Sequence, residues 1–86
     1  GDQFVRAVDS ISANVAEGFG RHGKNDKIKF YYYSFGSLNE SLDWNEKLKI
    51  RKLLTNEQYN HIFTELKKLP RELNYLIKFT REKLSE

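Results

Sequence analysis

Few side chains in this sequence have the types and spacing that catalysis needs. The two histidines, His22 and His61, have no acid or nucleophile at a useful sequence distance, and acid–base or nucleophilic catalysis requires such a partner. Glu17, Glu40 and Asp43 could meet between helices, but a ferritin-type di-metal site also needs Glu-x-x-His pairs on two helices, which the sequence lacks. We therefore predict no enzyme activity, metal, cofactor or small-molecule substrate, and interpret these acids as polar contacts between helices.

The stretch from Gly18 to Gly23 has the letters of the dinucleotide-binding motif G-x-G-x-x-G. That motif works only between a strand and a helix of a βαβ unit. Here an amphipathic helical pattern precedes the glycines and no strand pattern follows them. The sequence therefore predicts an interhelical turn and not a nucleotide-binding loop.

Positive charge is modest in total and uneven along the chain. The net charge is +3, yet residues 21–52 carry eight bases against four acids. Such a surface could face phosphate groups, and the alternative is that lysines only solvate helix ends. With the histidine of the turn, the candidate nucleic-acid-binding residues are Arg21, His22, Lys24, Lys27, Lys29, Lys47, Lys49, Arg51 and Lys52.

Composition predicts a small all-α protein. The chain has 86 residues, one proline and five glycines, with 31% charged residues, which favours one domain of long helices over many short strands. Cysteine is absent, so no disulfide can form, which is compatible with a reducing cytosol. No apolar run approaches the roughly 20 residues of a membrane span. We predict a cytoplasmic helical bundle over residues 1–86, with no membrane contact.

Hydrophobic residues recur at spacings of three and four in three segments, as in the buried stripes of bundle helices. The three long helices are predicted at about 2–18, 24–51 and 56–84.

Local signals mark the ends of these helices. Gly18 or Gly20 is expected to end the first helix in a left-handed conformation. Thr55 and Gln58 have the spacing of a capping box at the start of the third helix. Pro70 lies inside the third helix, and its ring and missing N–H predict a kink or break just before it.

Small and polar residues form a second row on the first helix, beside its apolar stripe. The row indicates close packing on a neighbour with hydrogen bonds across the contact, and we expect Asn14 or Glu17 to meet Ser37 or Glu40. Glycine in mid-helix costs about 1 kcal/mol relative to alanine, so we expect a neighbouring backbone to approach Gly36 closely. The residues of the row are Ser10, Asn14, Glu17 and Arg21.

The predicted helices differ in length. At about 1.5 Å per residue the second and third would each be roughly 40 Å long, and the first about 25 Å. Apolar surface on the longer pair is then left uncovered. Either a further helix or identical chains must cover it, and the sequence leaves both alternatives open.

The string from Ser10 to Arg21, followed by Gly36-Ser-Leu-Asn-Glu40, resembles the bacterial four-helix bundle family encoded in intervening sequences of 23S ribosomal RNA genes. The resemblance implies an up-and-down bundle that assembles as a ring-like pentamer, and kinship to nucleic-acid-binding accessory proteins of diversity-generating retroelements. The matching signature residues, which we interpret as structural, are Ser10, Asn14, Glu17, Gly18, Gly20, Arg21, Gly36, Ser37 and Glu40.

The resemblance also implies a family helix upstream of Asp2 that this chain lacks. The sequence contains no methionine, so we expect that Gly1 is not the initiating residue. Gly23 stands where the family leads us to expect a serine-type helix cap.

Two functions remain open at this stage. In the first, a homo-oligomeric bundle contacts nucleic acid, RNA or DNA, through its basic helix ends. In the second, a scaffold assembles with copies of itself or another protein through its aromatic helix faces and has no nucleic-acid role.

Overall fold

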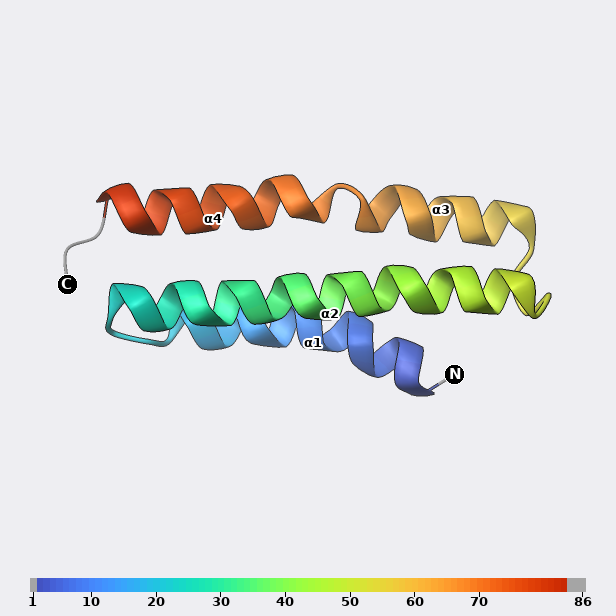
Figure 1. The fold of residues 1–86 in the computed structure, drawn as a ribbon, viewed down its shortest axis with the longest axis horizontal. Helices are drawn as coiled ribbons and strands as arrows, with labels where there is room; N and C mark the ends of the chain where they lie inside the picture. Colours follow the sequence, from blue (N-terminus) through green and yellow to red (C-terminus); the bar gives the residue numbers. More distant parts are fainter. Residues whose placement is uncertain (1, 84–86) are drawn as a thin grey trace.

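The computed structural model describes residues 2–83 and consists of helices connected by short turns (Figure 1). No strand occurs within this range. The chain runs along the long axis three times in alternating directions, with extents of 48 × 21 × 13 Å. The predicted all-α, up-and-down arrangement is confirmed. The helices are α1 (Asp2–Phe19), α2 (Lys24–Ile50), α3 (Asn56–Leu66) and α4 (Leu69–Lys83).

The third rod is two helices, because the chain leaves helical geometry between α3 and α4. Lys67 and Lys68 form the turn, and Pro70 lies in the first turn of α4. A proline in the first turn of a helix loses no hydrogen bond, because the N–H groups there have no intrahelical acceptor. The break therefore falls where Pro70 was expected to produce it. Residue 84, the last of the predicted third helix, lies outside the described residues.

The capping box at α3 is present with both of its hydrogen bonds. The Gln58 amide donates to Thr55 Oγ1 at 3.0 Å, and the Thr55 amide donates to Gln58 Oε1 at 2.9 Å. The preceding turn contains Lys52 at a φ of 61°, and the Leu53 amide donates to the Leu48 carbonyl at 2.9 Å. A lysine therefore occupies the left-handed position where helices usually place glycine.

Serine side chains hold α1 against α2. Ser34 is fully buried, and its hydroxyl donates to the Ile11 carbonyl at 2.7 Å. Ser37 donates to Ser10 Oγ at 2.9 Å. Polar contact between these helices was predicted, but the pairing was wrong, because Asn14 donates within its own helix to the Ser10 carbonyl at 2.9 Å.

The glycines reverse two expectations. A Cβ atom on Gly18 would lie 2.6 Å from Cε1 of Tyr31, whereas a Cβ on Gly36 would meet nothing within 4 Å. The close approach is thus at Gly18. The predicted approach of a neighbouring backbone to Gly36 was wrong, because no other part of this chain lies near Gly36. No glycine among residues 2–83 has positive φ, so the left-handed ending predicted for α1 was also wrong.

The end of α1 is closed by other groups. The Gly20 amide donates to the Glu17 carbonyl at 3.1 Å. The Lys27 ammonium reaches back from α2 and donates to the carbonyls of Gly18 and Phe19, at 3.3 and 3.0 Å. A cation at the negative end of a helix is favourable, so Lys27 replaces a glycine cap.

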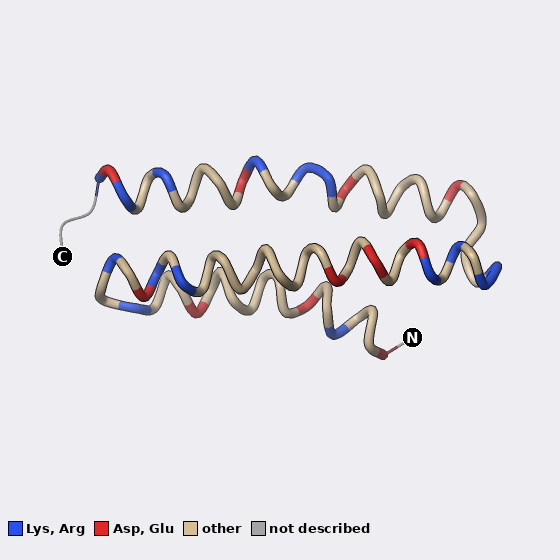
Figure 2. Tube along the Cα trace, in the orientation of Figure 1, with Lys and Arg blue, Asp and Glu red and all other residues tan. Residues whose placement is uncertain are grey.

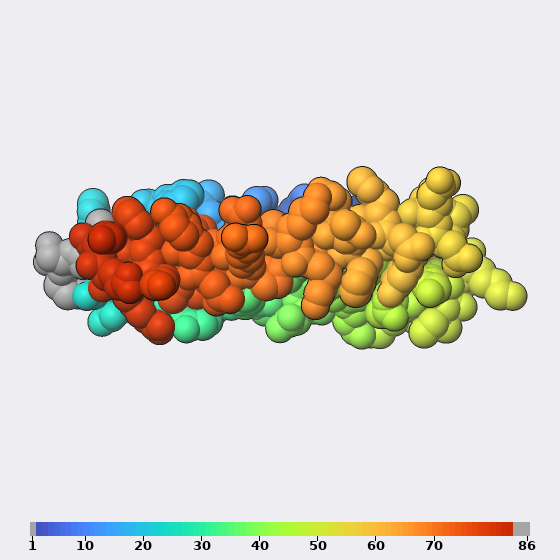
Figure 3. All heavy atoms as spheres, turned by 90° about the horizontal axis from the view of Figure 1, so that it is seen from above, coloured from blue at the N-terminus to red at the C-terminus, as the bar shows by residue number. Residues whose placement is uncertain are grey.

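The core lies where all three rods meet. Ile11, Leu38, Leu66 and Leu73 form one buried cluster. The second cluster consists of Ile28, Tyr31 and Ile77. Space-filling spheres show α3 and α4 lying along α2, while α1 emerges at one edge only (Figure 3).

Candidate nucleic-acid interface

The structure separates the predicted basic residues into two clusters at opposite ends of the molecule (Figure 2). The first follows α1 and enters α2, and the second ends α2. Within a molecule 48 Å long, charges at the two ends are screened from each other, since the Debye length at physiological salt is about 8 Å. The nine predicted residues therefore do not form one surface.

The last turns of α4 bring further bases to the first of these clusters. Arg81 Nη2 donates to the Tyr32 hydroxyl at 3.2 Å, and Ile77 packs on Ile28 and Tyr31. We call this surface the basic end. The end of α1, the α1–α2 turn, the start of α2 and the end of α4 contribute seven bases and three acids to it: Arg21, Lys24, Lys27, Lys29, Lys78, Arg81 and Lys83, with Glu17, Asp26 and Glu82.

Sequence reasoning missed Lys78, Arg81 and Lys83. The predicted up-and-down order of the helices could have identified them, because it places the end of α4 beside the α1–α2 turn (Figure 1).

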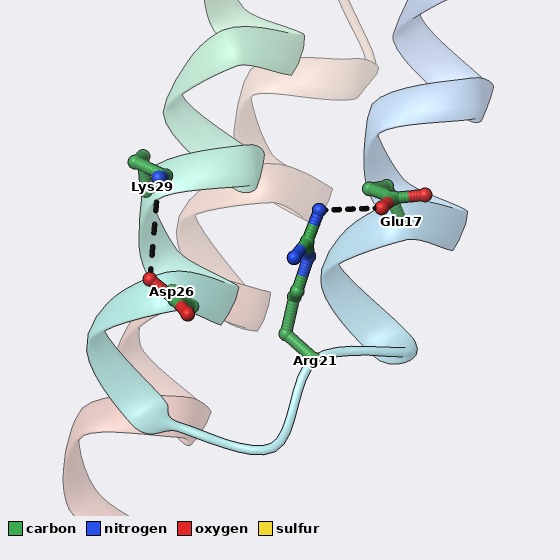
Figure 4. A network of polar contacts seen from close by, with 4 residues as sticks. All are labelled: Glu17, Arg21, Asp26 and Lys29. Atoms are coloured by element: carbon green, nitrogen blue, oxygen red, sulfur yellow. Dashed lines mark hydrogen bonds and ion pairs between the residues drawn. The ribbon is translucent and has the colours of Figure 1, made fainter.

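Several bases of the basic end already have partners. Arg21 pairs with Glu17 at 2.7 Å and Lys29 with Asp26 at 4.0 Å (Figure 4). Both pairs are solvent-exposed, and exposed pairs of this kind contribute little to stability. Either base can therefore exchange its carboxylate for a phosphate at small cost. Lys27 instead holds the end of α1.

The α1–α2 turn contains an open depression of about 400 Å³ lined by Glu17, Arg21, His22 and Asp26, among others. The start of α2 faces it, but Gly23 provides no side-chain cap. Two carboxylates on its walls oppose an anion. We therefore expect phosphates to contact the bases around the depression and not to enter it.

The second basic cluster is more dispersed. Lys47 pairs with Asp43 at 2.9 Å, and the Lys49 ammonium lies 4.2 Å from the centre of the Tyr59 ring. Arg51 and Lys52 lie in the exposed α2–α3 turn. Tyr59 also donates a hydrogen bond to Glu46, and this bond raises the pKa of Tyr59.

Aromatic side chains surround the basic end. Phe19, Tyr32, Tyr33, Tyr75 and Phe79 are all exposed there. Phe30 is only partly exposed, and Tyr31 is buried at 1% exposure. Burial raises the pKa of Tyr31, and a hydrogen bond with the Thr80 side chain partly offsets the rise.

An apolar groove of about 540 Å³ separates α1 from α4. Ile11, Val15 and Phe19 line one wall, and Leu69 and Leu76 line the other. The groove exists because α1 contacts α2 but not α3 or α4 at backbone level. It leaves apolar surface of two helices open to solvent.

The signature residues have distinct places. Ser10 and Ser37 meet between α1 and α2, Gly18 contacts Tyr31, and Gly20 lies in the turn. Gly36 and Glu40 are exposed on α2.

The predicted acidic candidates also separate. Glu17 pairs with Arg21 and Asp43 with Lys47, each along its own stretch of chain. Across residues 2–83 no three histidine or acidic side chains gather as metal ligands would. Within the same range no helix is long and apolar enough to cross a membrane.

Fold and site together define a small helical-bundle protein with a basic end and an open apolar groove. The model of the 23S rRNA-intervening sequence protein family matches residues 1–75. The chain belongs to that family, which confirms the resemblance inferred from the signature residues. Comparisons with curated proteins and with solved structures give no significant match.

Proposed function

We propose that this protein is a non-enzymatic, oligomeric bundle of the bacterial cytoplasm that binds nucleic acid through its basic end. The supporting observation is that bases from the α1–α2 turn and from the last turns of α4 converge around exposed aromatic side chains. Interleaved basic and aromatic groups are the usual surface for single-stranded nucleic acid. RNA and DNA are both candidate ligands, and the tests below use RNA.

Salt dependence gives the first test. Each phosphate contacted by a base on a single strand contributes about −0.7 to the slope of log K against log salt. Four contacts would therefore weaken binding about 50-fold between 50 and 200 mM salt. Fluorescence anisotropy with a labelled RNA containing an unpaired loop measures this slope. Absent binding, or binding indifferent to salt, would refute the proposal.

A matched pair of triple variants locates the interface. Lys24→Gln, Lys78→Gln and Lys83→Gln together remove three charges from the basic end. Lys49→Gln, Arg51→Gln and Lys52→Gln remove three from the opposite end. We expect the first variant to bind at least tenfold more weakly with a slope smaller by about 2, and the second to bind nearly as wild type. Equal losses would mean that total charge, and not the basic end, determines binding.

Assembly is the second part of the proposal and is supported by the groove between α1 and α4. Open apolar surface of this kind marks contact sites for other chains. A second copy that seats one of its own helices in this groove makes a head-to-tail contact, which is the type that closes rings. The pentamer implied by the family resemblance is such a ring.

Two alanines on α1 provide a matched test of assembly. Ala16 lines the groove and Ala13 does not, and both are exposed. Light scattering across a dilution series gives the mass of Ala16→Glu, which we expect to dissociate, and of Ala13→Glu, which we expect to retain the wild-type mass. A folded wild-type monomer at micromolar concentration would refute the assembly.

The alternative function, a protein-interaction scaffold without a nucleic-acid role, shares the mass prediction and reverses the binding prediction. The mass would still respond to Ala16→Glu, while no RNA or DNA would bind at either salt concentration. The two experiments together therefore separate the functions.

A further inference from the structure

A pocket of about 220 Å³ opens at the basic end, between the last turn of α1, the first turns of α2 and the last turns of α4. Its walls include the exposed rings of Phe19, Tyr75 and Phe79. Tyr31 also lines it and meets the Phe19 ring edge-on, with ring centres 6.0 Å apart. The pocket is therefore walled by aromatic surface from three helices.

Polar groups give the pocket a mixed character. Lys27 lies at its edge and uses two N–H groups on the carbonyls of Gly18 and Phe19. An ammonium has three N–H donors, so one is left for a ligand. Thr80 contributes a hydroxyl beside Tyr31. The occupant that suits these walls is a flat ring system with hydrogen-bonding atoms at its edge.

The positive charge around the pocket indicates what kind of ligand carries this ring system. Lys24 begins α2, and Lys78, Arg81 and Lys83 lie in the last turns of α4, which reach the same end of the bundle (Figure 2). A planar group carried on a phosphate chain is therefore favoured there. Every nucleic-acid base has a face that can stack on an aromatic ring, and stacking of this kind contributes about 1–3 kcal/mol per base.

We propose that this pocket receives one unpaired base of a nucleic acid whose phosphates contact the basic end. The inference rests on the proposed function and adds to it a ligand class, namely single strands or unpaired loops in place of uninterrupted duplex. The base lies against Phe79 and Tyr75, and its edge accepts from the Lys27 ammonium.

An apolar side chain from a second copy suits the pocket less well. It would cover the Lys27 ammonium without offering an acceptor, and burying an unpaired donor is costly. The groove described above differs on this point, because its α1 and α4 walls are predominantly aliphatic.

The structure offers a matched control for the stacking ring. Tyr75 and Phe79 form an i, i+4 stack with ring centres 6.2 Å apart, and Tyr59 and Phe63 form a similar stack at 6.0 Å. Phe79 is 43% exposed and Phe63 is 40% exposed. Phe79→Leu and Phe63→Leu therefore remove equivalent rings, one at the pocket and one at the other end of the third rod.

The test uses two RNA probes of the same sequence, one with an unpaired loop containing 2-aminopurine and one fully paired. With wild type we expect preferential binding of the unpaired probe and quenching of its fluorescence. Phe79→Leu should weaken binding of that probe about tenfold, abolish the quenching and leave the paired probe and the salt slope unchanged. Phe63→Leu should match wild type in every measurement, and circular dichroism melting verifies that both variants fold.

Each contrary result has a separate meaning. Salt-dependent binding that Phe79→Leu does not change, or equal affinity for both probes, overturns the base pocket and leaves the proposed function intact. A fall in molecular mass with unchanged affinity shows that the pocket is a contact between copies, which also overturns it. Failure of wild type to bind any RNA or DNA removes both the proposed function and this inference.

Discussion

Two glycines of the family signature should respond to the same substitution with opposite signs. Both lie within helices, Gly18 near the end of α1 and Gly36 in the middle of α2. A methyl group on Gly18 would lie 2.6 Å from the Tyr31 ring and 3.2 Å from the Lys27 carbonyl. A methyl group on Gly36 would meet nothing within 4 Å.

The magnitudes follow from the surroundings of each glycine. Overpacking a core costs about 1–3 kcal/mol, and Tyr31 cannot move away easily because it is 1% exposed between α1 and α4. Alanine recovers at most about 1 kcal/mol of helix propensity, so Gly18→Ala should lose about 1–2 kcal/mol. Gly36→Ala gains the propensity without a clash and should be more stable by about 0.5–1 kcal/mol.

Thermal unfolding followed by circular dichroism, at equal protein concentration, measures both changes. For a chain of this size 1 kcal/mol corresponds to about 4–8 °C in Tm. We expect Gly18→Ala to melt roughly 5–10 °C lower and Gly36→Ala about 4 °C higher than wild type. A stable Gly18→Ala would contradict the contact with Tyr31. A destabilised Gly36→Ala would show that another chain covers Gly36, since nothing within this chain does.

Three further predictions concern the helix ends and the buried tyrosine. Lys52→Gly should raise the unfolding free energy by about 0.5–1 kcal/mol in urea titration, because Lys52 is left-handed at a φ of 61°; a loss would mean that the lysine side chain stabilises the turn. Thr55→Ala should cost about 1 kcal/mol, because it removes the acceptor of the Gln58 amide, and Thr64→Ala on the exposed surface of α3 is its control. Because the pKa of Tyr31 is raised in the folded state, the stability it contributes is complete below pH 10 and is lost as pH rises through the folded pKa. Tyr31→Phe should flatten that alkaline loss, and an unchanged pH profile of Tm would refute its assignment to Tyr31.

Features encoded locally could be predicted from the sequence. The apolar spacing located the helices, and Thr55 with Gln58 specified the start of α3 through groups only three residues apart. Pro70 acted through its own ring and missing N–H, so the break before it required no knowledge of the neighbours. In each case the cause and its effect lie within one helical turn.

Features that depend on which helix face meets a neighbour could not be predicted. Gly18 and Gly36 look equivalent in the sequence, but only the tertiary structure places the first against Tyr31 and the second in solvent. For the same reason the sequence predicted the bases of the α1–α2 turn and the start of α2 but missed those of α4, since Arg81 reaches Tyr32 across 49 positions in the chain.

The small residues of α1 and the open groove have one common cause. Ser10 and Gly18 let α1 lie so close to α2 that Ser34 reaches the Ile11 carbonyl at 2.7 Å. Both α1 and α4 pack on α2. Because α1 lies so close to α2, it does not reach α4, and the backbones of α1 and α4 do not come into contact. A larger residue at position 18 would both strain Tyr31 and move the wall that carries Phe19. Ser10 and Gly18 of the signature string therefore shape the groove and the aromatic pocket through packing and need not touch a ligand themselves.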